Sequence, residues 1–352
     1  MKTLLFRSLG PALLLFAPWL AHCSDAAPAV GTGGPGDGGE VVDGGAGGDA
    51  AEVPLVDHAI AENLSRVVAL AATDDALYAA VGPTLRRYDL KTNEVSTLWS
   101  TDASYSPEVS GVEILGETLY ATDRSTVHAM DLAGGSGKNL LAMTHYMGNQ
   151  KSNVTWHLGA SGAYRFAYDE ANLVRFAADG TGTPTRSKIT NFFYLLPAGG
   201  NLWLVSHFDD YTIRVVPASS PTTTFLSFDA SDTGNVKEHG DKLAANTKYV
   251  YSAETAGQTS KLVRYDNPTR AGAPVRKTLG TLDGPPERMV ADEQNLFVGT
   301  QTSLTRYSLD GAEPKVLVAR GAPSPLAVNK DYVFWVEYGS GTGTDKIRAT
   351  PR

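Results

Sequence analysis

The sequence predicts an all-β protein. The expected fold is a seven-bladed β-propeller with four-stranded antiparallel blades, the last completed by an N-terminal strand. A hydrophobic–aromatic pair recurs seven times between residues 77 and 334, at intervals of 37 to 48 residues. Each copy lies in a unit that reads as four short strands, and no apolar pattern with a period of 3.6 residues reaches helix length. Units of this length with four strands are typical of propeller blades.

The recurring pair marks the second strand of each unit. A small apolar strand precedes it, such as VVALAA at 67–72, RMVA at 288–291 or PLAV at 325–328, and a short polar turn separates the two. Because the aromatic residues recur from unit to unit, we expect them to fill the gaps between blades rather than to contact a ligand. The seven pairs are Leu77-Tyr78, Leu119-Tyr120, Ala163-Tyr164, Leu202-Trp203, Val250-Tyr251, Leu296-Phe297 and Val333-Phe334.

The third strand carries a recurrent Leu-x-Arg-aromatic pattern. Its arginines could form an anion-binding set, but equivalent positions in a propeller lie around the ring and do not converge. We therefore expect each arginine to pair locally with an Asp or a carbonyl group. A hairpin then leads to a fourth strand, such as EPKVLVA at 313–319. The arginines are Arg87, Arg175, Arg264 and Arg306.

The seventh unit ends after its third strand, KIRAT at 346–350. A blade that lacks its outer strand would leave an open edge, which folded proteins avoid. The apolar stretch VPLVDHA at 53–59 is the expected donor of the missing strand. The propeller domain is therefore predicted to span residues 53–352.

The first 23 residues are predicted to be a targeting signal. Lys2 and Arg7 form a short basic region, and an apolar run follows over 9–20. Cys23, the only cysteine in the chain, ends a Leu-Ala-His-Cys stretch that resembles the lipobox of bacterial lipoproteins, although His22 stands where that family usually has a small residue. The resemblance implies a lipidated Cys23 and delivery to the outer membrane, with the side of that membrane left open. The alternative is an ordinary secreted protein cut nearby.

Residues 24–52 differ in composition from the rest of the chain. Ten of the 29 residues are Gly, six are acidic and none is basic. Such a segment cannot bury enough apolar surface to offset its chain entropy. We expect a flexible tether with a reach of roughly 30 Å between the anchor and the propeller.

The stretch LYATD at 119–123 resembles the Tyr-Trp-Thr-Asp repeat of extracellular propellers, with Ala121 in the Trp position. Residues 119–142 follow that repeat along most of a blade, and 296–319 do so without the Thr-Asp. That family usually has six blades, whereas seven units are counted here. The resemblance implies an architecture and no particular activity, and Asp123 is expected to fix its own turn.

Function is expected where the repeat is irregular. We call the side of the ring with the turns between first and second strands the bottom face, and the side with the second-to-third hairpins and the interblade loops the top face. The interblade loops 101–111, 144–153 and 229–242 are the longest, and their aromatic and acidic residues suit sugar or peptide contacts. A metal is not predicted, although His207, Asp209 and His239 are of ligand type. The candidate ligand-binding residues are Tyr105, His145, Tyr146, Tyr168, Asp169, Glu170, His207, Asp209, Asp210, Tyr211, Glu238 and His239.

No strong catalytic motif is present in the sequence. G-x-S-x-G, H-E-x-x-H, EF-hand and P-loop patterns are all missing, so no catalytic residue and no cofactor are predicted. The net charge of −8 disfavours nucleic acid as a partner. The expected function is that of a monomeric, lipid-anchored propeller that binds an envelope protein or glycan through its top face. The alternatives are a secreted enzyme of the lyase, lactonase or glycosidase type, which would use the top-face His and carboxylate residues, and a purely structural envelope component.

Overall fold

The chain divides into two units, Met1–Glu52 and Val53–Arg352. All the residues that the structure, a computed structural model, describes belong to the second unit. They are residues 57–101, 109–123, 126–135, 137–142, 159–161, 164–169, 172–188, 192–206, 212–219, 226–229, 243–256, 259–266, 274–319, 324–339 and 344–352.

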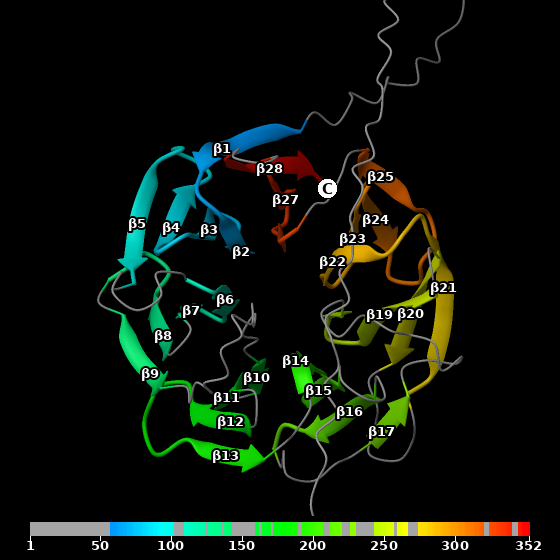
Figure 1. Ribbon diagram of the computed structural model, residues 1–352, viewed down its shortest axis with the longest axis horizontal. Helices are drawn as coiled ribbons and strands as arrows, with labels where there is room; N and C mark the ends of the chain where they lie inside the picture. Colours follow the sequence, from blue (N-terminus) through cyan, green and yellow to red (C-terminus); the bar gives the residue numbers. More distant parts are fainter. Residues whose placement is uncertain are drawn as a thin grey trace, which may run out of the picture. The chain divides into compact units, whose positions relative to one another are not determined.

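The second unit is a ring of seven four-stranded antiparallel sheets (Figure 1). None of the described residues is helical. The predicted fold class and blade count are therefore confirmed. The first three blades contain β2 (Val67–Ala72), β3 (Ala76–Val81), β4 (Thr84–Asp89) and β5 (Val95–Ser100); β6 (Gly111–Leu115), β7 (Thr118–Thr122), β8 (Thr126–Asp131) and β9 (Lys138–Ala142); and β10 (Gly159–Ser161), β11 (Tyr164–Asp169), β12 (Asn172–Ala177) and β13 (Thr185–Lys188).

The other four blades follow the same order. In Figure 1 the first strand of each blade lies nearest the centre of the ring and the fourth lies at its periphery. These blades contain β14 (Phe192–Ala198), β15 (Asn201–Ser206), β16 (Thr212–Pro217) and β17 (Leu226–Asp229); β18 (Ala244–Ala245), β19 (Tyr249–Ala256), β20 (Thr259–Asp266) and β21 (Arg276–Leu282); β22 (Pro286–Ala291), β23 (Asn295–Thr300), β24 (Leu304–Ser308) and β25 (Lys315–Val318); and β26 (Leu326–Val328), β27 (Tyr332–Glu337), β28 (Asp345–Pro351) and β1 (His58–Leu64).

An N-terminal strand completes the seventh blade, as predicted. β1 pairs antiparallel with β28, from His58 opposite Ala349 to Leu64 opposite Asp345. The described pairing runs from His58 to Leu64, later than the predicted donor at 53–59, of which residues 53–56 lie outside the described part of the chain. The later placement brings the buried side chain of Leu64 into the core cluster shared by blades 7 and 1.

The second-strand aromatic residues fill the gaps between blades in six of the seven units, where they are buried. The third unit is the exception and corrects the prediction. Tyr164 is 42% exposed, whereas Phe166 is fully buried and lies opposite Arg175, as Tyr78 lies opposite Arg87 in the first blade. The equivalent residue of the third blade is therefore Phe166.

Two of the buried tyrosines also donate a hydrogen bond to the next blade. The Tyr78 hydroxyl donates to the carbonyl oxygen of Leu132 at 2.9 Å, and the Tyr251 hydroxyl donates to that of Leu309 at 3.0 Å. Both carbonyls lie in hairpins between third and fourth strands. Since a buried hydroxyl needs a partner, these bonds let a polar aromatic residue occupy the interblade core.

A glycine follows two residues later in each of these hairpins. Gly134 and Gly311 have φ values of +90° and +83°, a region that side chains rarely adopt. A Cβ on Gly134 would lie 2.7 Å from Cδ2 of Leu98, and a Cβ on Gly311 would overlap Cβ of Leu279. Each leucine comes from the fourth strand of the preceding blade, so the glycine makes room for the neighbour's side chain.

Two of the four third-strand arginines pair locally with an Asp, as the sequence predicts. Arg87 binds Asp89 at 2.8 Å, and Arg264 lies 3.8 Å from Asp266. Arg175 instead stacks its guanidinium over the ring of Tyr164, 3.7 Å from the centroid. Arg264 also donates to the carbonyl oxygen of Leu309 in the next blade at 3.3 Å. These three arginines therefore have separate partners and do not form a common anion site.

Asp89 also holds the hairpin that follows β4. Its pKa lies well below the usual range, because the carboxylate accepts the backbone N–H of Thr92, pairs with Arg87 and accepts the N–H of Lys91. The folded hairpin therefore stabilises the ionised form of the Asp89 carboxyl group.

The bottom-face turns are linked from blade to blade. The side-chain oxygen of Asn329 accepts the N–H groups of Asp331 and Tyr332, which closes its own turn at 3.0 and 2.7 Å. Its side-chain N–H donates to the carbonyl oxygen of Thr73 in the first blade at 3.1 Å. Asn246 repeats the arrangement between blades 5 and 6, with a bond of 3.0 Å to the carbonyl oxygen of Asp292.

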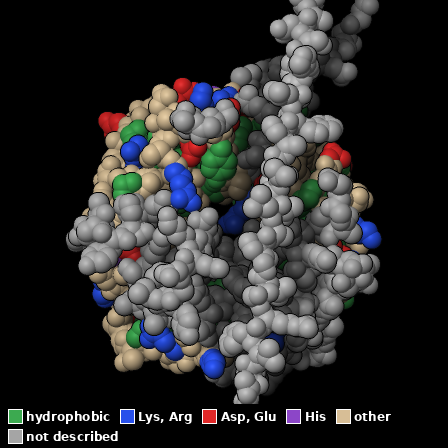
Figure 2. All heavy atoms as spheres, in the orientation of Figure 1, with side chains coloured by type: hydrophobic (Ala, Val, Ile, Leu, Met, Phe, Trp, Pro, Cys, Tyr) green, Lys and Arg blue, Asp and Glu red, His purple; other side chains and the backbone are tan. Residues whose placement is uncertain are grey.

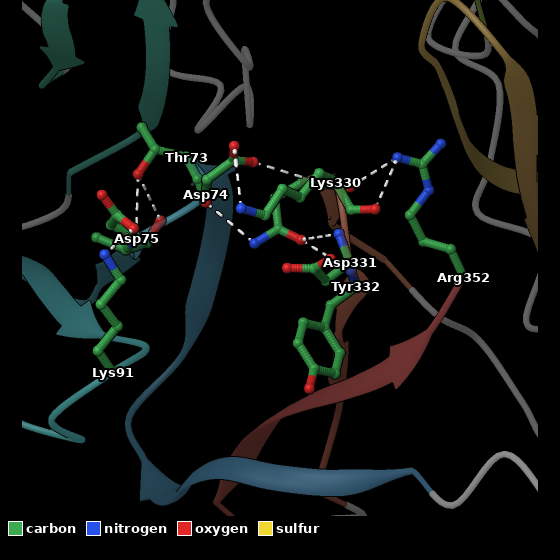
Figure 3. Close-up of polar contacts among 10 residues, drawn as sticks. Thr73, Asp74, Asp75, Lys91, Lys330, Asp331, Tyr332 and Arg352 are labelled. Carbon is green, nitrogen blue, oxygen red and sulfur yellow. Dashed lines mark hydrogen bonds and ion pairs between the residues drawn. The ribbon is translucent and has the colours of Figure 1, made fainter.

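The junction between blades 6 and 7 uses Arg352 instead. Figure 3 shows its guanidinium extending from the end of β28 to the neighbouring turns. It donates to the carbonyl oxygens of Asn329 and Lys330 at 2.9 and 3.3 Å, and it pairs with the carboxylate of Asp292 in blade 6. Together with the two asparagines, Arg352 connects the bottom-face turns of blades 5, 6, 7 and 1.

Candidate functional site

Most of the predicted ligand-binding residues lie outside the described part of the chain. Tyr168 and Asp169 lie at the top-face end of β11, where only their backbone is described. The structure therefore leaves the predicted site on the long loops untested. The residues outside the described ranges are Tyr105, His145, Tyr146, Glu170, His207, Asp209, Asp210, Tyr211, Glu238 and His239.

Asp123, at the end of the LYATD stretch, fixes its own turn as predicted. One carboxylate oxygen accepts the N–H of Thr126 at 2.7 Å, which closes the hairpin between β7 and β8. The other lies 3.1 Å from Nε2 of His128. The His128 ring is 8% exposed and packs on Trp99, with centroids 4.3 Å apart. This imidazole is enclosed by its own neighbours and is not available to a ligand.

A second polar group lies on the top face where blades 7 and 1 meet. Asp345, at the start of β28, is 8% exposed and accepts two backbone N–H groups. The donors are Val67 at 2.7 Å and Gly339 at 3.4 Å. Arg66 directly precedes Val67, and Tyr338 directly precedes Gly339. One buried carboxylate therefore holds Arg66 and Tyr338 near each other.

Blade 6 adds two polar residues to this group. Glu287 lies on the innermost strand β22, and the side-chain amide of Gln301 donates to its carboxylate at 3.3 Å. The pKa of the Tyr338 phenol is raised first by burial and then by Asp345 and Glu287, while Arg66 opposes the shift. Charges from three blades therefore act on one phenol. We call Arg66, Glu287, Gln301, Tyr338 and Asp345 the inner rim.

The space-filling view supports this location. Figure 2 shows a hollow at the centre of the ring. Basic, acidic and hydrophobic side chains meet beside it, over the elements that Figure 1 labels β1, β2, β27 and β28. Arg66 directly precedes the innermost strand β2, and Glu287 lies on the innermost strand β22, so these two rim residues stand at the inner side of their blades.

Sequence reasoning missed the inner rim because it took its candidates from the long interblade loops and from hairpins of the third and fourth units. Arg66 and Tyr338 stand in short connections, and no local motif marks them. The closure of the ring could have pointed to them, because the N-terminal strand that completes blade 7 places Arg66 at the start of blade 1.

Among the described residues, no cluster of three His, Cys, Asp or Glu side chains is arranged to hold a metal ion. Nor does any helix in that part of the chain have the length and apolar character needed to cross a membrane.

No protein-family model matches the chain, and no curated protein matches it. Solved structures match over most of its length. The WD40 domain of Neurospora crassa Pan2 is 7% identical with a TM-score of 0.60, over 82% of this chain and 90% of that one. An oligogalacturonate lyase from Vibrio parahaemolyticus is 7% identical with a TM-score of 0.59, over 86% and 94%.

A chain of the mitotic checkpoint complex is 11% identical with a TM-score of 0.58, over 88% of this chain and 98% of that one. At these identities the likeness concerns the fold, and the fold hosts unrelated functions. By its topology and by this likeness, the chain is a seven-bladed β-propeller.

Proposed function

We propose that the protein is a lipid-anchored module of the cell envelope that binds a protein or a glycan through the top face of its propeller. Cys23 would carry the lipid, residues 24–52 would form the tether, and the ring would present the site. Delivery to the outer membrane belongs to the same proposal.

The observation that carries this proposal is the difference between the two faces of the ring. The described bottom-face turns bond to one another through the side chains of Asn246, Asn329 and Arg352. The top face carries the longest interblade connections and the inner rim. Loops that no repeat constrains are where propellers and other scaffolds place binding residues.

A chain of the mitotic checkpoint complex and an oligogalacturonate lyase share this fold, so the fold serves both binding and catalysis. Binding is favoured here because the sequence lacks a catalytic motif. An enzyme would lose turnover, but keep its fold, when His207 or Asp209 is changed to Ala.

The proposal is tested in two steps with the full chain. Cys23→Ser should release the protein from the membrane fraction, and retention would contradict the lipid anchor. The released protein should then co-sediment with native envelopes, and equal-length Gly-Ser replacement of 101–111, 144–153 and 229–242 should abolish this. The bottom-face control Lys248→Ala should bind normally. Equal binding by loop-replaced and control proteins would contradict a top-face site.

A further inference from the structure

We propose that the inner rim is a binding site for a neutral saccharide. This inference rests on the proposed binding function, and it places the ligand on blades 6, 7 and 1 rather than on the long loops. The ligand would stack on Tyr338 and hydrogen-bond to Arg66, Glu287 and Gln301.

The rim is held in place by its own contacts, without a ligand. The Asp345 carboxylate accepts the backbone N–H groups of Val67 and Gly339 at 2.7 and 3.4 Å, which fixes the backbone on either side of the junction between blades 7 and 1. Glu287 and Gln301 hold each other at 3.3 Å. Polar groups that are positioned before binding lose little entropy when a ligand arrives.

Tyr338 presents an aromatic surface at the rim. It is 50% exposed, and the charges of Asp345, Arg66 and Glu287 act on its phenol. Ligand sites combine an aromatic surface with a few convergent polar groups. A sugar ring presents an apolar face to the former and hydroxyls to the latter.

The charges of the rim are mixed. Arg66 is positive and Glu287 is negative, and the carboxylate of the buried Asp345 already accepts two backbone N–H groups. A carboxylated or cationic ligand would therefore meet a like charge in either case. Planar Arg, Glu and Gln side chains offer both donors and acceptors, as a hydroxyl-rich neutral ligand requires.

The test uses the full chain with Cys23→Ser and three tetrasaccharide probes, followed by calorimetry and saturation-transfer NMR. Cellotetraose and chitotetraose are neutral, and tetragalacturonate is acidic. We expect at least one neutral probe to bind, and Tyr338→Ala to weaken it about tenfold, the scale of a lost aromatic contact. Tyr338→Phe keeps the ring and should bind within about threefold of the wild type.

Tyr164→Ala is the matched control, because Tyr164 is also an exposed tyrosine, 42% accessible, at the other end of a blade. It should bind like the wild type. The inference is overturned if neither neutral probe binds, if tetragalacturonate binds more tightly than both, or if Tyr338→Ala binds normally. Envelope binding that depends on the long loops but not on Tyr338 would overturn this site and leave the proposed function standing.

Discussion

The contact between Gly311 and Leu279 gives the sharpest prediction for how neighbouring blades fit together. In Gly311→Ala, the new Cβ would overlap Cβ of Leu279 and lie 3.2 Å from its Cα. Neither atom can move away by a simple side-chain rotation. The substitution also places an L-residue at a φ of +83°.

The magnitude follows from two separate costs. Placing Ala in the left-handed region costs roughly 1–2 kcal/mol, and overpacking a tight contact costs roughly 1–3 kcal/mol more. Gly116→Ala is the matched control, because Gly116 has a φ of +67° and its Cβ would meet nothing within 4 Å. The difference between the two variants isolates the contact, at about 1–3 kcal/mol.

Gly134→Ala should fall between these variants, since its Cβ would meet only the tip of Leu98, 2.7 Å away, which can rotate. Thermal and urea unfolding of the three variants would measure the series. At about 2 °C per kcal/mol for a large domain, Gly311→Ala should melt roughly 2–6 °C below Gly116→Ala. Equal melting temperatures for the two would refute the proposed interblade contact.

Three further predictions concern the bottom face. Asn329→Asp keeps the oxygen that closes the turn but loses the donor to Thr73, so urea unfolding should show a loss of about 1–3 kcal/mol; an unchanged midpoint would contradict a link between blades 7 and 1. Arg352→Met should raise the hydrogen-exchange rate at the turn that contains Asp292, and unchanged exchange would contradict its bridging role. Asp89 has a lowered pKa, so its contribution is present above the unfolded value near 4 and is lost as the pH falls toward the folded value. Asp89→Asn should therefore flatten the fall of the urea midpoint between pH 5 and 3, and an identical pH profile would count against this.

The sevenfold repeat made the fold predictable. The two-residue alternation within each strand explains the main error, which was to choose Tyr164 instead of Phe166 in the third unit. A strand returns to the same face every two residues, so a shift of two leaves the alternation intact. Tyr164 and Phe166 are separated by that distance, and only the burial of Phe166 opposite Arg175 distinguishes them. β1 was misplaced for a related reason, since an edge strand with few buried residues fixes its register weakly.

The inner rim could not be predicted from local sequence. Val67 and Asp345 are 278 positions apart, and their hydrogen bond exists only because the ring closes. Arg66 and Tyr338 each stand in an ordinary polar connection. The closure that brings them together could be inferred from the sequence, but the side chains that meet there could not.

The central claim is that the protein binds through its top face. Single photo-reactive benzoylphenylalanine residues in place of Gln301 on the top face and of Asp331 on the bottom face would test this in native envelopes, since both positions are exposed. We expect covalent adducts from position 301 and none from position 331. Adducts from position 331 alone, equal adducts from both positions, or none from either would contradict the account.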